Sequence, residues 1–381
     1  MRNIMKLCLL LIFILFLQTA NAQERQRVRD LGIKPGILTP GPLNAITDVE
    51  GVKVGHRTII EGDSVRTGVT MIFPHGDDLF KSRVPAAVYV GNGFGKALGF
   101  TQVQELGELE TPIGRTNTLS IHTVANGITD YVLRQPGNEN VRSVNPVVGE
   151  TNDGWLNDIR GRHVTMEHVF NAIENAKDGS VEEGSVGAGT GTSALGFKGG
   201  IGTSSRTLPE KFGGYTVGIL VQSNFGGVLT IDGAPVGEDL NNHYMASDVP
   251  YDVDGSVMII VATNAPLLSR NLERLAKRAL LGISRVGGLA SNGSGDYVIA
   301  FSTSEDVRIN TQSSGSTQNY KELNNSDTTP LFLAAVEATE EALLNSLFMA
   351  TTVTGDRGHT QQALPIYKVL SIMKKYNLLE E

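Results

Sequence analysis

The chain is nearly free of cysteine, since Cys8 is the only one among its 381 residues. Cys8 lies in a segment that we expect to be removed. The mature protein would then have no disulfide, no thiolate nucleophile and no cysteine-based metal site. The seven histidines show no H-E-x-x-H or similar ligand spacing. The sequence therefore predicts no metal and no cofactor, and His359 is interpreted as a structural residue or part of a surface turn.

Long apolar runs and long runs of one charge are also missing. Outside the N-terminus no apolar stretch approaches the about 20 residues that span a bilayer, and no run of five like charges occurs. Removal of the first 22 residues leaves 30 basic residues against 40 acidic ones, a net charge of −10. This balance is unlike that of a nucleic-acid-binding protein. The 40% share of hydrophobic residues excludes a disordered chain.

Residues 1–22 have the pattern of a secretory signal peptide. Arg2 and Lys6 form a basic start, residues 7–17 an apolar stretch, and Ala20-Asn21-Ala22 a cleavage motif. We therefore expect a mature chain that begins at Gln23 and is exported, to the periplasm, with no membrane attachment. An uncleaved N-terminal anchor is the alternative, which the short apolar run and the cleavage motif disfavour.

The rest of the chain interleaves strand-like and helix-like patterns along its whole length. No Pro/Ser-rich linker divides it, so we predict a single α/β domain over residues 23–381. Pro146 makes one predicted strand the least secure, and the polar residues 310–329 are predicted to form a mobile loop. The expected strands are 86–90, 145–149, 216–222, 257–262 and 297–302, and the expected helices are 118–134, 166–176, 268–283, 331–350 and 366–376.

A glycine-rich block over residues 187–202 resembles a phosphate-binding loop only superficially. In a P-loop, lysine directly follows the last glycine of G-x4-G and Ser or Thr comes next. Here Phe197 separates Gly196 from Lys198, and Gly199 follows. The spacing of the dinucleotide fingerprint is also absent. We interpret the block as backbone in tight packing, with the wall of a substrate pocket as the alternative.

A candidate nucleophile, Ser294, lies between Gly293 and Gly295 just before an apolar strand. Glycine allows a strained turn, in which the serine hydroxyl can attack the preceding carbonyl and cleave the Gly293–Ser294 bond. Ser294 would then carry a free α-amino group, with a pKa near 8, that can act as its base. The alternative is a plain turn. A conventional triad serine would follow a strand, so none is predicted.

Several segments resemble, in the same order, the L-aminopeptidase/D-esterase (DmpA-like) and β-peptidyl aminopeptidase family of autoprocessing N-terminal-nucleophile hydrolases. Beside the Ser294 block they are GFKGGIGTSSR at 196–206, VGILVQSNFG at 217–226, VATNAPL at 261–267, ATEEA at 338–342 and TGDRGH at 354–359. The similarity extends over residues 36–370. It implies a four-layer α-β-β-α sandwich, shared with ornithine acetyltransferases.

The resemblance also implies how such a protein matures and acts. A precursor would cut itself into an α chain, residues 23–293, and a β chain, residues 294–381, and assemble as a homotetramer of processed units. The activity would be removal of N-terminal residues from peptides, amides or esters, without metal or cofactor. The substrate would be a peptide or an amino-acid amide, possibly a β-peptide.

On the same resemblance, the family's acidic residue falls on Glu340. It would bind the free amino group of the substrate or assist proton transfer near Ser294. The alternative is a helix-edge glutamate paired with a basic side chain, and Glu341 on the more polar side is the second candidate. Ala338 stands where the β-peptidyl enzymes have serine, with Thr339 beside it, which argues against a β-peptide preference.

An oxyanion hole requires donors directed at the developing negative charge. Asn264, after a predicted strand, resembles the family's side-chain donor, and Asn224 is the second choice. For both, a turn-forming asparagine is the alternative. Leu195 stands where some members have a tyrosine donor.

Two other functions stay open on sequence grounds. One is an acyltransferase on the same fold, which would pass an acyl group from Ser294 to an amine. Its family branch resembles a threonine-nucleophile enzyme without a signal peptide. The other is an inactive binding or scaffold protein, which would keep a full-length mature chain.

Overall fold

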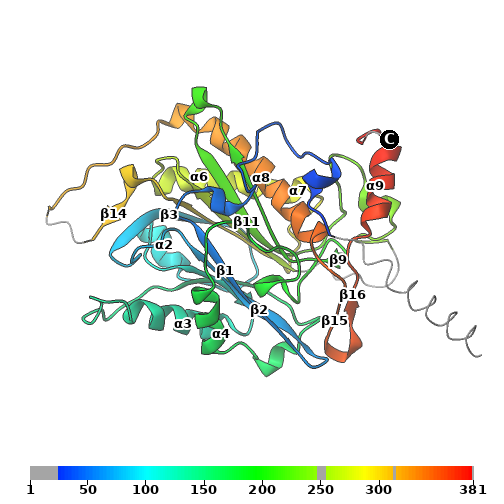
Figure 1. The fold of residues 1–381 in the computed structure, drawn as a ribbon, viewed down its shortest axis with the longest axis horizontal. Helices are drawn as coiled ribbons and strands as arrows, with labels where there is room; N and C mark the ends of the chain where they lie inside the picture. The colour runs from blue at the N-terminus through cyan, green and yellow to red at the C-terminus, as the bar shows by residue number, and fades with distance from the viewer. Residues whose placement is uncertain (1–24, 247–254, 312–314, 380–381) are drawn as a thin grey trace, which may run out of the picture.

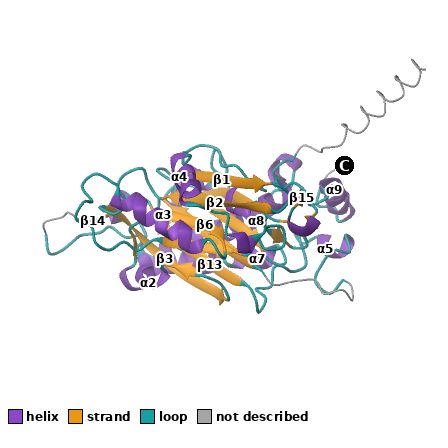
Figure 2. Ribbon diagram, turned by 90° about the horizontal axis from the view of Figure 1, so that it is seen from below, coloured by secondary structure: helices purple, strands orange, loops and turns teal. Residues whose placement is uncertain are grey.

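The computed structural model describes residues 25–246, 255–311 and 315–379. Two β-sheets pack face to face, and helices cover both outer faces (Figures 1 and 2). This arrangement confirms the predicted α-β-β-α sandwich. The predicted signal peptide and its cleavage site lie outside the described residues.

The larger sheet has seven strands, and the predicted nucleophile directly precedes one of them. Its order is β10-β11-β12-β13-β3-β14, with β5 also paired to β3, and β12–β13 is the parallel pair. Most of its central strands are buried on both faces, which explains their continuous apolar runs. The strands are β3 (Ser82–Gly93), β5 (Glu108–Leu109), β10 (Ile201–Thr207), β11 (Thr216–Asn224), β12 (Ser256–Thr263), β13 (Gly295–Ser302) and β14 (Ile309–Asn310).

The smaller sheet has five strands in the order β1-β2-β6-β7-β4. Pro146 directly precedes β7, so the strand loses no ladder donor there. The strands are β1 (Lys53–Glu61), β2 (Val65–Phe73), β4 (Ala97–Leu98), β6 (Ile113–Asn117) and β7 (Val147–Thr151). Two short hairpins complete the strands, formed by β8 (Ser193–Ala194) with β9 (Phe197–Lys198) and by β15 (Val353–Thr354) with β16 (Thr360–Gln361).

The helices divide between the two outer faces. In Figure 1, α6 (Ser269–Ala279) and α8 (Thr329–Phe348) lie over the larger sheet, and α3 (Ile121–Leu133) and α4 (Met166–Glu174) lie on the opposite side, over the smaller one. The predicted helix 268–283 is divided at Leu280 into α6 and α7 (Leu281–Arg285). The remaining α-helices of the described chain are α2 (Phe100–Leu106), α5 (Val236–Asp239) and α9 (Ile366–Lys375). None of the described helices is both long and apolar enough to cross a membrane.

The glycine-rich block contains tight backbone contacts. A Cβ on Gly202 would stand 1.9 Å from the Ala342 carbonyl oxygen of α8, and one on Gly189 would stand 2.5 Å from the Ile201 nitrogen. Any side chain there would force the layers apart, which agrees with the tight-packing interpretation. Gly191 and Gly196 also line a cavity, so the pocket-wall alternative applies to part of the block.

The polar segment 310–329 is partly described. It contains the last residue of β14, a single turn of 3-10 helix at Asn325–Asp327 and the first residue of α8. Residues 312–314 lie outside the described part. The predicted mobility of this segment stays a prediction.

Candidate active site

Ser294 lies at the end of a tight turn that leads into β13. Its backbone N–H donates to the Ser291 carbonyl over 3.0 Å, so the Gly293–Ser294 bond lies inside the turn. Asn92, near the end of β3, closes this turn. Its Nδ2 donates to the carbonyls of Ser291, at 2.8 Å, and of Ser294, at 2.5 Å. The predicted junction is therefore a turn held at both ends.

The Ser294 hydroxyl is buried and already engaged. Its side chain is 1% exposed, and Oγ donates to Asp296 Oδ1 over 2.6 Å. Burial raises the pKa of Asp296 to about 6, opposed by the Ser294 hydroxyl and the Val257 N–H. Asp296 follows Ser294 by two residues and is the second residue of β13. The sequence interpretation did not identify Asp296.

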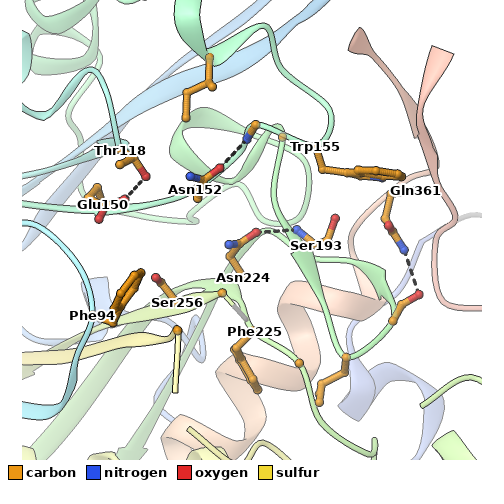
Figure 3. Close-up of a pocket in the computed structure, with 18 of the residues that line it drawn as sticks. Phe94, Thr118, Glu150, Asn152, Trp155, Ser193, Asn224, Phe225, Ser256 and Gln361 are labelled. Carbon is orange, nitrogen blue, oxygen red and sulfur yellow. Dashed lines mark hydrogen bonds between the residues drawn. The ribbon is translucent and has the colours of Figure 1, made fainter. Parts of the chain in front are cut away.

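A cavity of about 830 Å³ opens beside this turn, and Gly293 is one of its lining residues. Figure 3 shows the Thr118–Glu150 pair on one side and Trp155 and Gln361 on the other, with Asn224 and Ser193 between them. The size is typical of a cavity that encloses a small organic ligand. The bond before Ser294 thus borders a space large enough for a short peptide.

The register of the larger sheet separates the two oxyanion candidates. Asn224 pairs with Ser256, and Ser256 pairs with Gly295, so these three residues lie at one end of the sheet beside Ser294. Asn224 lines the cavity, and its Oδ1 accepts from the Ser193 N–H over 2.9 Å. This contact orients the amide and leaves its Nδ2 donors for the cavity.

Asn264 does not fit the predicted role. It follows Thr263, which pairs with Ser302 at the opposite end of β12 and β13. Seven residues of strand separate that end from Ser256, about 23 Å at about 3.3 Å per residue. Asn264 is exposed, and its Oδ1 accepts from the Thr216 N–H over 2.8 Å, so it caps the neighbouring strand. Asn224, the second choice, replaces it as the candidate donor.

Glu340 lies on α8, none of whose residues lines the cavity. Its carboxylate is buried and bonds the Arg285 guanidinium of α7. Burial raises the pKa of Glu340, and Arg285 opposes this effect. The structure thus shows the paired alternative that the sequence left open, and no hydrogen bond between described residues joins Glu340 to Ser294. Thr339 is buried beside it and donates to the Ala335 carbonyl within the helix.

Glu341, the other acidic candidate, belongs to a buried ion-pair network. Its carboxylate bonds Arg206 of β10 at 2.8 Å and Arg29 at 2.8 Å, and Asn44 donates to it at 2.5 Å. Arg206 also bonds Glu337, one helical turn before Glu341. This network joins the segment before β1 to α8 and β10, which gives Glu341 a structural role.

Replacement of Glu341 by Ala is expected to lower the free energy of unfolding by about 3–5 kcal/mol, because it removes one of the two carboxylates that pair with the buried Arg206 guanidinium. Glu273→Ala is the matched control, since it breaks an exposed pair with Lys277 whose contribution is below about 1 kcal/mol. Urea unfolding followed by circular dichroism measures both. Equal losses in the two variants would contradict the buried-network interpretation.

Glu150, at the end of β7, is the acidic residue that the sequence interpretation missed. It is 3% exposed and is the only acid among the described residues that line the cavity. One carboxylate oxygen accepts from the backbone N–H of Lys96 over 2.9 Å, and the other accepts from the Thr118 hydroxyl. Its position directly after the predicted strand 145–149 was the available signal, because functional side chains often follow buried strands.

The far wall of the cavity is aromatic. Trp155 stacks on His359 with ring centroids 3.8 Å apart, and His359 Nδ1 lies 2.8 Å from the Trp155 carbonyl oxygen. His359 therefore packs in a turn, as predicted. Leu195, at the aligned position of the tyrosine donor, lines the cavity with an apolar side chain. In the described part of the chain, no three His, Cys, Asp or Glu side chains are placed to hold a metal ion.

Comparison with known proteins identifies the family. The profile of Peptidase family S58 matches residues 44–361. The chain belongs to this family. It is 42% identical to the β-peptidyl aminopeptidase BapA of Sphingosinicella microcystinivorans over 96% of each chain. This result confirms the resemblance inferred from the sequence.

Two solved structures support the same assignment. A β-aminopeptidase of a Burkholderia species is 43% identical, with a TM-score of 0.84 over 92% of this chain and 99% of that one. The L-aminopeptidase D-Ala-esterase/amidase of Ochrobactrum anthropi is 36% identical, with a TM-score of 0.86 over 93% and 99%. The latter is described as a prototype of the serine aminopeptidases and a variant of the Ntn hydrolase fold. The predictions of a serine aminopeptidase and of an N-terminal-nucleophile hydrolase are therefore confirmed.

Proposed function

We propose that the S58 protein is exported, cuts itself between Gly293 and Ser294, and releases N-terminal residues, β-amino residues included, from short peptides and amides. The observation that carries this proposal is the position of the junction. The Gly293–Ser294 bond lies in a turn whose two ends are hydrogen-bonded by Asn92, at the edge of a cavity of about 830 Å³ that is also lined by the buried Glu150. The products of self-cleavage are residues 23–293 and 294–381.

Cleavage of the junction creates the groups that peptide hydrolysis needs. Ser294 gains an α-amino group, which takes the hydroxyl proton as Oγ attacks the substrate carbonyl. Asn224 donates to the resulting oxyanion from the end of β11. The α-amino group passes that proton to the departing nitrogen, the amine product leaves, and water hydrolyses the ester on Ser294. The acyltransferase alternative differs only in the last step, where an amine replaces water.

Glu150 is the group in the cavity that suits a substrate ammonium. Its two oxygens are fixed by the Lys96 N–H and the Thr118 hydroxyl, which orients the carboxylate without neutralising it. A β-amino residue places its ammonium one carbon farther from the scissile carbonyl than an α-amino residue does. The cavity has room for both, and Ala338 does not restrict it, because no α8 residue lines it. Similarity to β-peptidyl aminopeptidases supports the β-peptide assignment.

Export to the periplasm and assembly into a homotetramer of processed units are part of the proposal. The basic, apolar and A-x-A pattern of residues 1–22 supports export. The resemblance of the remaining chain to the autoprocessing family supports the assembly. N-terminal sequencing of the protein secreted from its native host, with a size measurement by light scattering, tests both. A scaffold protein would give one chain that starts at Gln23.

Replacement of Glu150 by Gln is expected to lower kcat/KM for substrates with a free amine by about 10- to 100-fold, the contribution of a charge-assisted hydrogen bond of about 1.5–3 kcal/mol. For the wild type, kcat/KM should be much lower with N-acetylated substrate than with free-amine substrate. Glu150→Gln should reduce this difference. The measurement is a comparison of free and acetylated β-amino-acyl and α-amino-acyl p-nitroanilides.

Glu340→Gln is the matched control for this experiment. It alters a buried carboxylate outside the cavity and is expected to leave the gap between free and acetylated substrate unchanged. Equal turnover of both substrates by the wild type would exclude an aminopeptidase. If the difference in kcat/KM between free and acetylated substrate becomes smaller in Glu340→Gln but not in Glu150→Gln, Glu340 is the residue that binds the ammonium group.

A further inference from the structure

The Ser294 hydroxyl forms its hydrogen bond with Asp296, two residues farther along the chain. Ser294 is the last residue before β13, Asp296 is the second residue of that strand, and both are 1% exposed. The distance from Ser294 Oγ to Asp296 Oδ1 is 2.6 Å, typical of an O–H···O⁻ hydrogen bond. The attacking atom of self-cleavage therefore already donates its proton to a carboxylate.

Asp296 has the surroundings of a group that readily takes up a proton. Its Oδ2 has no hydrogen-bond partner among the described residues, and a lone buried carboxylate oxygen favours the protonated form. Burial is the largest influence on its pKa. Among the described residues, no charged side chain of the adjoining β12, β3 or α6 shifts the pKa of Asp296. The neighbouring Tyr297 has its own pKa raised by burial, Glu150 and Asp296.

The remaining geometry holds the acceptor and the scissile bond together. Asn92 Nδ2 bridges the two ends of the turn, and Gly295 N donates to the Gly255 carbonyl and to Ser256 Oγ. These bonds fix the residues on both sides of the junction. A fixed junction lowers the entropic cost of bringing the hydroxyl to the carbonyl.

We propose that Asp296 is the general base of self-cleavage, an assignment that rests on the proposed function of Ser294. Asp296 takes the proton from Ser294 Oγ, and Oγ forms a bond to the Gly293 carbonyl carbon. The C–N bond of the Gly293–Ser294 peptide then breaks, and the Asp296 proton passes to the departing nitrogen. The resulting ester between Gly293 and Ser294 Oγ is hydrolysed by water to the Gly293 carboxylate, with the hydroxyl and free amine of Ser294 restored.

This assignment divides the work of proton transfer between two groups. Before cleavage the Ser294 nitrogen is a peptide amide and cannot act as a base. Asp296 serves that single event, and the newly formed α-amino group serves the later turnovers. Maturation and peptide hydrolysis would thus use different bases on the same hydroxyl.

The test is the rate of self-cleavage of the full-length chain made in a cell-free translation system. Loss of the uncleaved chain is followed on denaturing gels between pH 5 and 8. Asp296→Asn retains the shape and a hydrogen-bond acceptor but cannot take the proton. It is expected to slow cleavage by at least about 100-fold, the usual effect of general-base catalysis. The wild-type rate should rise with pH through the region near 6 and then level off.

Each outcome decides one assignment. Cleavage of Asp296→Asn at the wild-type rate, with the wild type itself cleaved, overturns the role of Asp296 alone. A wild type that never cleaves overturns the proposed function instead. If Asp296→Asn does not fold, as judged by circular dichroism, the wild-type pH profile decides, and a rate independent of pH from 5 to 8 overturns the proposal. Asp296→Glu, which retains the carboxylate, should recover part of the lost rate.

Discussion

Ser294→Ala is expected to give a single uncleaved chain with no measurable aminopeptidase activity. The hydroxyl is the attacking atom in both reactions, and its removal also prevents formation of the α-amino base. Loss of a nucleophile of this kind costs at least about 10⁴-fold in rate. The fold should be preserved, because the turn is closed by backbone bonds and by Asn92 rather than by the serine side chain.

Intact-mass measurement of the purified protein checks the cleavage, and p-nitroanilide turnover checks the activity. Ser291→Ala is the matched control, because Ser291 belongs to the same turn and contributes its backbone carbonyl to it. It should still be cleaved into the two chains. If Ser294→Ala were cut at the same bond as the wild type, an outside protease would be responsible, and the self-cleavage mechanism would be wrong.

The central strands of the larger sheet could be predicted from the sequence because their residues are mainly apolar and β-branched. The predicted strands 216–222, 257–262 and 297–302 differ from β11, β12 and β13 by at most two residues at either end. Strands β1, β2, β6 and β10 were not predicted. In β10 the sequence Ile-Gly-Thr-Ser-Ser-Arg-Thr is almost entirely buried. Its polar side chains are satisfied by distant partners, such as Glu337 and Glu341 for Arg206, which no local pattern reveals.

In the candidate site, too, some residues could be recognised from their sequence neighbours, whereas others depend on contacts between segments far apart in the chain. Ser294 was identified from neighbouring glycines, which is a local signal. Asn224 and Asn264 both follow strand-like segments, and only the pairing of β11, β12 and β13 shows which of them lies beside Ser294. The family resemblance selected Glu340 but could not reveal Arg285 on α7 as its partner. Glu150 reaches the cavity from the other sheet, a relation set by the packing of the two layers.

Replacement of Asn224 by Ala is expected to lower kcat by about 10²- to 10³-fold, the usual cost of one oxyanion donor, with little change in KM. Asn224→Asp is a sharper variant, because it retains an acceptor for the Ser193 N–H while it removes the donor. The fall in kcat for Asn224→Asp should be at least as large as that for Asn224→Ala. Both measurements use protein whose cleavage has been verified by mass, so that turnover is separated from maturation.

Asn264→Ala is the control that tests the choice between the two asparagines. Asn264 is exposed at the far end of β12 and accepts the Thr216 N–H. Its replacement should reduce stability slightly and leave kcat within about twofold, since surface changes away from the site usually cost less than about 0.5 kcal/mol. The reverse pattern, a large fall in kcat for Asn264→Ala with normal kcat for Asn224→Ala, would contradict the assignment of Asn224 as the oxyanion donor. A rise in KM without a fall in kcat for Asn224→Ala would assign this residue to substrate binding, because only a donor that bonds more strongly in the transition state changes kcat.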